Sequence, residues 1–334
     1  MTTQTTIEIT LEGQAFPPNH RYDLEQPLLQ GRVSLEGVTI KPSAPMQSAG
    51  FFDNAKFEKG EFGLLDINVG DVIPAIEAGW DMVCLPVFNK RKPVYNYLWV
   101  RADRGIDSPK DLEGRTFGTV GYASSISTFS RGLLARFYGV DLTKLRWLLP
   151  APGRFPLYRG VESQMEYATG ERKSSAQRLL DGEIDASTGD ITDAAAWQAL
   201  ESSPDVKRLF PDYQAMNKQL WLENGVHTPT HVIVMGGKLN REHPELARML
   251  YDAFVESKRL ALNDAMGDGT SYSMLMHMRE AMRDQLADWG DVYPMGIKAD
   301  RNTIDWFLDF NLEQGLTRER LSDEQVFAAS TLDT

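Results

Sequence analysis

The stretch Thr230-His231-Val232-Ile233-Val234-Met235-Gly236-Gly237, "THVIVMGG", decides the fold. Its apolar run contains several β-branched side chains, which favour a strand. A turn containing Pro229 precedes the run and two glycines follow it, so both ends of the strand are marked. Because a largely helical C-terminal third comes next, we interpret Thr230–Met235 as the strand that returns the chain to the lobe in which it began.

The remaining chain alternates short apolar runs with amphipathic segments, as is typical of an α/β protein. The expected strands are Thr6–Leu11, Phe62–Val69, Met82–Val87, Tyr97–Arg101, Thr116–Thr119, Arg146–Leu149, Ile184–Ser187 and Thr230–Met235. The expected helices are Asp71–Ala78, Ser125–Tyr138, Ser174–Asp181, Asp190–Glu201 and Pro244–Asn263.

Two of these strands are expected to connect two lobes. Tyr97–Arg101 would carry the chain out of the first α/β block, and Thr230–Met235 would carry it back. We therefore predict a discontinuous lobe one, residues 1–100 and 230–334, around a continuous lobe two, residues 101–229. A ligand cleft would lie between the lobes.

Composition narrows the classes of function. A length of 334 residues favours two lobes. The formal net charge of −12 argues against nucleic acid or an anionic membrane as a partner, because both would repel the protein. One cysteine, Cys84, excludes an internal disulfide, and we expect it to be a buried strand residue. The N-terminus lacks the features of a secretory signal, so we expect a cytoplasmic protein.

Several spaced segments carry a resemblance to a known family. They are "GRVSLEGVTI" (31–40), "GIDSPKDLEGRTFG" (105–118), "RGLLARFYGVD" (131–141), "THVIVMGGKL" (230–239), "YPMGIKADRNTIDWFLDFNLEQGLT" (293–317) and "LSDEQVFAAST" (321–331). Together they resemble the 4,5-dihydroxyphthalate decarboxylase family. The resemblance implies a type-two periplasmic-binding-protein-like fold and a cytoplasmic lyase that decarboxylates an aromatic carboxylate of the dihydroxyphthalate or hydroxybenzoate kind, in aromatic compound catabolism.

Two departures from the family pattern leave alternatives open. Asp66-Ile67-Asn68 stands where the family commonly has Glu-Met-Ser, and Val94-Tyr95-Asn96 stands where it tends to have Arg-His-Ser. One alternative is an enzyme of this fold with a different reaction. Another is a non-catalytic solute-binding protein for an aromatic or dicarboxylate ligand.

Decarboxylation of a hydroxylated ring requires three kinds of group: a general acid, a group that polarises the phenol, and donors that orient carboxylates. His231 is our first candidate for proton transfer, because imidazole titrates near neutrality and the position matches the family's histidine. Asp66 could accept a phenolic proton, and Tyr95 is an alternative phenol-polarising donor. No organic cofactor fingerprint is present, so we expect none.

The expected substrate contacts come from both lobes. Ser124 and Ser125 open a helix whose free amides favour an anion, and Asn68 ends a lobe-one strand. Arg131 is either a substrate clamp or part of an ion pair between the lobes. The remaining candidates are Asp190, His227 and Arg154.

No metal site is expected from the two neighbouring histidines. Pro229 lies between His227 and His231 and disfavours the helix that a His-x-x-x-His metal pair needs. The stripe Met274, Met276, Met278 and Met282 fits either core packing or contact between copies of the chain, which leaves a homo-oligomer open.

Overall fold

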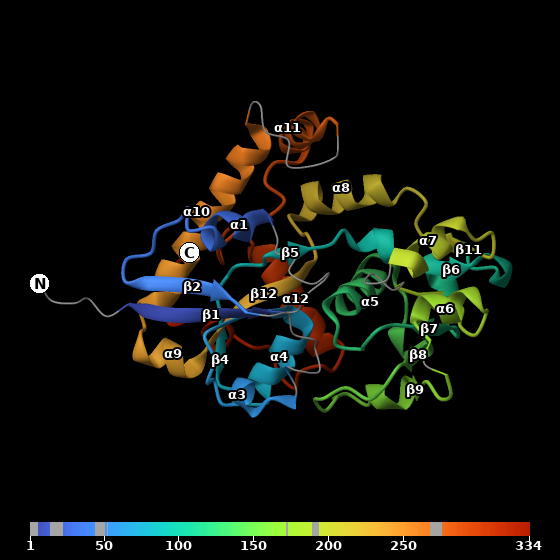
Figure 1. Ribbon diagram of the computed structural model, residues 1–334. Coiled ribbons are helices and arrows are strands. Elements are labelled where there is room, and N and C mark those ends of the chain that lie inside the picture. The colour runs from blue at the N-terminus through green and yellow to red at the C-terminus, as the bar shows by residue number, and fades with distance from the viewer. Residues whose placement is uncertain are drawn as a thin grey trace, which may run out of the picture.

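The computed structural model describes residues 6–13, 23–43, 51, 53–171, 173–188, 194–267 and 276–334. These residues form two six-stranded sheets, at the left and right of Figure 1. The first sheet has the order β2 (Val38–Pro42), β1 (Ile7–Gly13), β3 (Leu64–Asn68), β12 (Pro229–Gly236) and β4 (Met82–Cys84), and β5 (Lys90–Arg91) also pairs with β12.

The second sheet has the order β11 (Val206–Arg208), β6 (Trp99–Arg101), β10 (Ala186–Ser187), β7 (Thr116–Gly118), β8 (Arg146–Leu149) and β9 (Met165–Tyr167). β6 and β12 run antiparallel to their neighbours. They are the strands by which the chain passes to the second sheet and returns to the first, so the predicted two-crossover α/β plan is confirmed. The lobe boundaries at residues 100 and 230 stay a prediction, and the first falls inside β6.

Helices cover and join the sheets. They are α1 (Gln26–Leu29), α3 (Ala55–Glu58), α4 (Val69–Glu77), α5 (Ser125–Tyr138), α6 (Ser175–Leu180), α7 (Ala194–Ser202), α8 (Tyr213–Asn224), α9 (Gly237–Glu242), α10 (Leu246–Met266), α11 (Met278–Trp289), α12 (Arg301–Glu313) and α13 (Asp323–Val326). α5 has the bounds that the sequence predicts. It ends at Gly139, whose φ of 60° is the left-handed conformation that commonly terminates helices.

Four strands escaped the sequence analysis. β5 spans two residues and β9 spans three, too few for an alternating pattern to be recognised. β2 does alternate, with half-buried Val38 and Ile40 and exposed Thr39 and Lys41, and was overlooked. β11 has three residues, of which only Val206 is buried. Pairing with neighbouring strands, rather than local sequence, stabilises these segments.

One apolar core runs through both sheets. It joins Ile67 and Val232 of the first sheet to Trp147 of the second. Between the sheets the rings of Phe129 on α5 and Phe307 on α12 stack, with centroids 5.7 Å apart. A second core packs the opposite face of the first sheet against α10.

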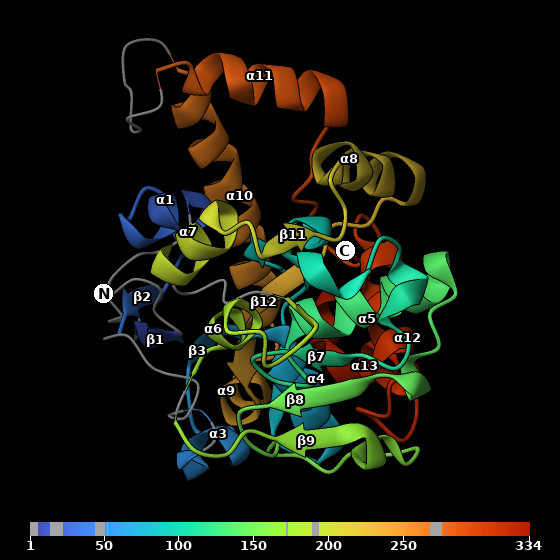
Figure 2. The same cartoon turned by 90° about the vertical axis from the view of Figure 1, so that its right-hand side faces the viewer.

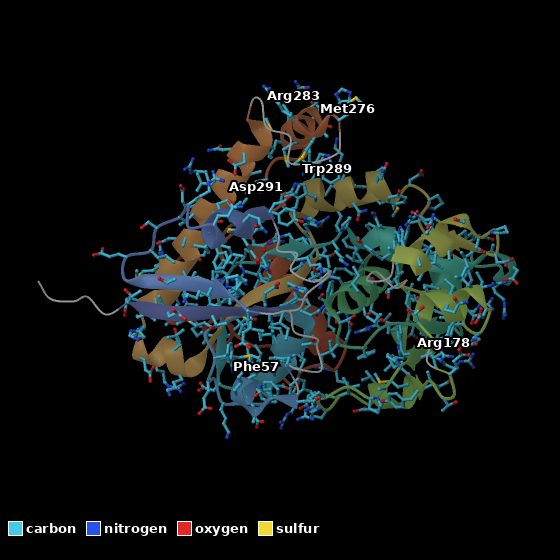
Figure 3. The ribbon with its side chains drawn as sticks, in the orientation of Figure 1. Phe57, Arg178, Met276, Arg283, Trp289 and Asp291 are labelled. Carbon is cyan, nitrogen blue, oxygen red and sulfur yellow. The ribbon has the colours of Figure 1, made fainter. Side chains whose placement is uncertain are left out.

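α10 and α11 form an arm that rises from the first sheet in Figures 1 and 2. Met276, labelled at the tip of this arm in Figure 3, is 87% exposed and does not serve the core. Met278 and Met282 are half-buried on α11, which contacts α8 and α10. Met274 lies outside the described residues. Within the described ranges, no helix has both the length and the apolar character needed to cross a bilayer.

Candidate active site

The carboxyl ends of β1, β2 and β3 lie at one edge of the first sheet, because these strands are parallel. β12 begins at this edge and runs beside β3 in the opposite direction. In this register His231 pairs with Asn68, and Lys90 of β5 pairs with His231 from the other side. Directly paired residues place their side chains on the same face of a sheet. His231 is therefore flanked by polar side chains from both neighbouring strands.

His231 and Asp66 form a buried pair. His231 Nδ1 lies 2.8 Å from Asp66 Oδ1, and the two side chains are 3% and 2% exposed. When Asp66 is ionised, Nδ1–H donates this hydrogen bond and Nε2 is an acceptor. Burial lowers the pKa of His231 and Asp66 opposes this effect, with a net direction below the usual range. His231 is thus a neutral imidazole at neutral pH.

Two lysines near this pair were missed by the sequence analysis. Lys90 and Lys92 both act on the charge of His231, and they lower its pKa. Burial lowers the pKa of Lys90 itself, while Asp66 opposes that effect. Arg91 between them makes a buried ion pair with Asp300. Only the "KRK" run could have signalled these lysines, and it does not show which of them faces His231.

The N-termini of α4 and α5 meet beside β12. Asn68 Oδ1 accepts hydrogen bonds from the backbone N–H of Gly70 (2.9 Å) and of Ser125 (3.2 Å), and so caps one helix while it touches the other. A Cβ on Gly70 would overlap Ala123 O and lie 2.7 Å from Ser125 N. The Ser125 hydroxyl donates to Thr230 O (3.4 Å). We call this meeting point of Asn68, Gly70 and Ser125 the helix junction.

The structure thus gathers four predicted site residues: His231, Asp66, Asn68 and Ser125 lie on adjoining segments at one edge. Ser124 immediately precedes α5, and its hydroxyl lies 2.7 Å from that of Ser127. Free amides at the start of a helix favour an anion. The amides of Gly70 and Ser125 already donate to Asn68 Oδ1, so a carboxylate near the helix junction would take its donors from the amides that follow Ser125 in the first turn of α5.

Arg131 lies in the interface between α5 and α12, where it is 1% exposed. Its Nε donates to Gln314 Oε1 (2.6 Å), its Nη2 donates to Tyr122 O (2.7 Å), and it lies 3.7 Å from the centre of the Tyr122 ring. Its Nη1 makes no hydrogen bond with the described part of the chain. The sequence analysis considered an ion pair between the lobes for Arg131. In the structure Arg131 donates a hydrogen bond to the side-chain amide oxygen of Gln314.

Gln314 was not predicted as a site residue. Its side-chain Oε1 accepts from Arg131, and its side-chain Nε2 donates to Thr128 O (2.8 Å). Its backbone carbonyl accepts from the Tyr122 hydroxyl (3.2 Å). It joins the end of α12 to α5 by two contacts and to Tyr122, just before α5, by a third. From the sequence, Gln314 was only part of the "EQGLT" segment that resembles the family, and nothing there indicated which residues it contacts.

Tyr95 packs in an aromatic group. Its ring meets Phe210 edge-on at 4.8 Å, and its hydroxyl accepts from Tyr138 (3.3 Å). Burial raises the pKa of Tyr95. These contacts suit a packing residue, and Tyr95 makes no hydrogen bond to His231 or Asp66 in the described ranges.

His227 is separate from His231. Its Nδ1 bonds to Val292 O (2.9 Å), and burial together with Arg91 lowers its pKa to about 4. Different partners therefore hold the two imidazoles. Arg154 is exposed in a loop. Asp190 lies outside the described residues.

A cavity of about 350 Å³ opens at the carboxyl ends of β7 and β8. Thr119 lines it, and the Thr119 hydroxyl bonds to that of Ser127 at the start of α5. Arg178, labelled on the second-sheet side in Figure 3, and Lys173 lie on its wall. Both cations are paired with Glu183.

Comparison with known proteins places this geometry in context. No family model matches the chain. The 4,5-dihydroxyphthalate decarboxylase of Comamonas testosteroni is 26% identical over 322 residues, which cover 94% of this chain and 96% of that protein. An enzyme of the same name from Pseudomonas putida is 24% identical over 37% of this chain and 47% of its own length.

The similar solved structures share the fold at low identity. The sulfonate-binding protein SsuA of Methylobacillus flagellatus superposes with a TM-score of 0.58 at 13% identity, covering 96% of this chain and 91% of its own. SsuA of Escherichia coli gives 0.53 at 14% identity, covering 99% and 100%. A mutant of the desulfurization enzyme DSZB with biphenyl-2-sulfinic acid gives 0.50 at 15% identity, covering 98% and 97%. The chain is thus related over nearly its whole length to 4,5-dihydroxyphthalate decarboxylase, on a two-sheet fold similar to that of periplasmic binding proteins.

Proposed function

We propose that this protein decarboxylates a hydroxylated aromatic carboxylate of the 4,5-dihydroxyphthalate type. The two relatives named for that reaction support a decarboxylase, and the first of them aligns with 94% of the chain. The observation that carries the proposal is the buried His231–Asp66 pair beside the helix junction. It combines a proton-transfer group with donors for a carboxylate.

Loss of CO2 from an aromatic ring requires protonation of the ring carbon first, because the π system cannot stabilise an in-plane carbanion. Removing a proton from an ortho or para phenol supplies the electron density for that step. His231 Nε2 can accept the phenolic proton, and Asp66 stabilises the resulting imidazolium and holds the ring in place. His231 thus carries a proton in each cycle.

The substrate carboxylates would be held at the helix junction. The amides that follow Ser125 in the first turn of α5 and the hydroxyl of Ser124 would supply donors, and Asn68 would add its side-chain nitrogen. The Ser125 hydroxyl would donate to the substrate only by leaving Thr230 O. Lys90 and Lys92 add positive charge on the side of β5. The proposal includes binding of the substrate between the two lobes. It also includes a cytoplasmic location, which fractionation of the native host tests.

The test is turnover by the purified protein of a panel of hydroxyphthalates and hydroxybenzoates, with CO2 release and ring products measured. We expect His231→Gln to lose about 10²-fold or more in kcat and to keep much of its ligand affinity. His227→Gln is the matched control, because its ring bonds to the Val292 carbonyl. Equal losses in the two variants would refute the role given to His231.

The alternative is a solute-binding protein, since two of the similar solved structures are sulfonate-binding proteins. The desulfurization enzyme among the similar structures indicates that the fold also accommodates catalysis. Tight binding of several members of the panel without any turnover would refute the decarboxylase and favour this alternative.

A further inference from the structure

The cavity at the carboxyl ends of β7 and β8 has a wall of mixed character. Its volume of about 350 Å³ lies in the range of small-molecule sites. Val120, Leu148 and Pro150 form an apolar part of the wall, and Lys173 and Arg178 contribute two cations. The described residues of the wall include no carboxylate. The cavity therefore favours a small ligand that combines an apolar surface with negative charge.

The cavity lies where open α/β sheets bind their ligands. β7, β8 and β9 run parallel, so their carboxyl ends share one edge of the second sheet. Thr119 follows β7, Pro150 follows β8 and Ala168 follows β9, and all three residues line the cavity. Ligands of such sheets bind outside the carboxyl ends of the strands.

The two cations keep donors that their ion pairs do not use. Arg178 donates through Nη1 to Glu183 and through Nη2 to Glu171 O, and Lys173 donates to Asp181 and Glu183. A guanidinium has five N–H groups and an ammonium has three. Within the described ranges, three donors of Arg178 and one of Lys173 therefore stay available. Asp181 and Glu183 fix the two cations without lining the cavity themselves.

Ser175 adds a hydroxyl to the same wall. Its oxygen is shielded from solvent and has no hydrogen-bond partner among the residues that the structure describes. Buried hydroxyl groups are nearly always hydrogen-bonded in folded proteins. Ser175 is therefore a further donor for an anion in the cavity.

The wall of the cavity is connected to the start of α5 through Ser127. The Thr119 hydroxyl bonds to that of Ser127, which in turn lies 2.7 Å from the hydroxyl of Ser124. Two hydrogen bonds in series place the Thr119 and Ser124 hydroxyls within about 6 Å of each other. The backbone N–H of the residue after Ser124 bonds to Asn68 at the helix junction. The cavity therefore adjoins the proposed site.

This spacing suits two carboxylates on adjacent carbons of an aromatic ring. With C–C bonds of about 1.5 Å, the two carboxyl carbons lie about 3 Å apart and their outer oxygens up to about 5 Å apart. One carboxylate can then contact the donors at the start of α5 while the other enters the cavity beside Thr119. A ring with a single carboxylate can occupy only one of these two positions.

We propose that the cavity binds the carboxylate that the substrate retains, and that it makes the protein selective for rings with two adjacent carboxylates. This inference rests on the proposed decarboxylation, in which one carboxylate leaves near His231 and the other stays on the product. Arg178 pairs with the retained carboxylate, and Lys173 adds positive charge beside it. The apolar part of the wall packs against the ring.

The experiment measures the binding of two unreactive probes, phthalate and benzoate, by calorimetry. We expect the wild type to bind phthalate about tenfold or more tightly than benzoate. Arg178→Gln should weaken phthalate binding about tenfold or more and benzoate binding by no more than about threefold, because benzoate is held at the start of α5. Arg178→Lys should recover part of the phthalate affinity. Arg146→Gln is the matched control, because Arg146 is 58% exposed at the amino end of β8.

A second variant tests the volume of the cavity rather than its charge. Ala168→Leu fills part of the cavity and leaves Lys173 and Arg178 unchanged. We expect the same selective loss of phthalate affinity, with correct folding checked by urea unfolding. The inference is overturned if either Arg178→Gln or Ala168→Leu, correctly folded, binds phthalate as the wild type does. It is also overturned if either variant loses phthalate and benzoate affinity equally.

Turnover separates this inference from the proposed function. A wild type that decarboxylates 4,5-dihydroxyphthalate but binds phthalate no more tightly than benzoate would overturn the inference alone. A wild type that decarboxylates no member of the panel, yet prefers phthalate in a manner that depends on Arg178, would overturn the proposed function and support the dicarboxylate site.

Discussion

Asp71→Asn should stabilise the folded protein at alkaline pH. In an unfolded chain the pKa of aspartate is about 4, whereas burial raises that of Asp71 to about 7. Each tenfold difference in proton affinity corresponds to about 1.4 kcal/mol, so ionising Asp71 in the folded state costs up to about 4 kcal/mol. The cost is fully present above pH 7, decreases as pH falls, and disappears below about pH 4. The folded carboxyl has the higher pKa, so the wild type loses stability relative to the neutral variant as pH rises.

The assay is urea unfolding of wild type and Asp71→Asn at several pH values between 5 and 8.5, followed by the fluorescence of the seven tryptophans. We expect the variant to be more stable at pH 8 by about 2 to 4 kcal/mol, because partial solvation of the half-buried side chain reduces the full figure. The difference should shrink steadily towards pH 5. Asp103→Asn should change stability in the opposite direction, since Arg101 lowers the pKa of Asp103. A difference that does not vary with pH, or a less stable variant at pH 8, would refute this explanation.

Three further substitutions test packing around the site. Gly70→Ala should force α4 from α5, because the added Cβ overlaps a backbone oxygen, and we expect phthalate affinity measured by calorimetry to fall about tenfold or more. Gln314→Ala leaves the buried Arg131 without one of its two acceptors and should cost about 2 to 3 kcal/mol in urea unfolding, whereas unchanged stability would mean that the contact is dispensable. Asp300→Ala leaves the buried guanidinium of Arg91 without its counter-ion and should cost about 3 to 5 kcal/mol, which thermal unfolding would detect.

The parts of the fold that depend on local pattern could be predicted from the sequence. The apolar run at Thr230–Met235 became β12, and the hydroxyl-rich start at Ser125 became the first residue of α5. His231 was identified by its place at the start of the returning strand. Its pairing with Asp66 was not predicted, because that contact depends on the register between β12 and β3, which brings together residues 165 positions apart.

The missing parts of the candidate site depend on three-dimensional surroundings. Lys90 is one of three consecutive basic residues, and only the strand register shows that it is the one paired with His231. Arg131 was named as a candidate, but the burial that places it between α5 and α12 has no local signature.

The close contact between α5 and α12 restricts how the molecule could open. A Cβ at Gly132 would overlap the ring of Phe310, so the two helices touch with no space for a larger residue. Phe129 adds stacked and edge-on contacts with Phe307 and Phe310. A rotation of one sheet away from the other would therefore have to pivot about the contact between α5 and α12. A ligand would then enter and leave on the side of the molecule away from that contact.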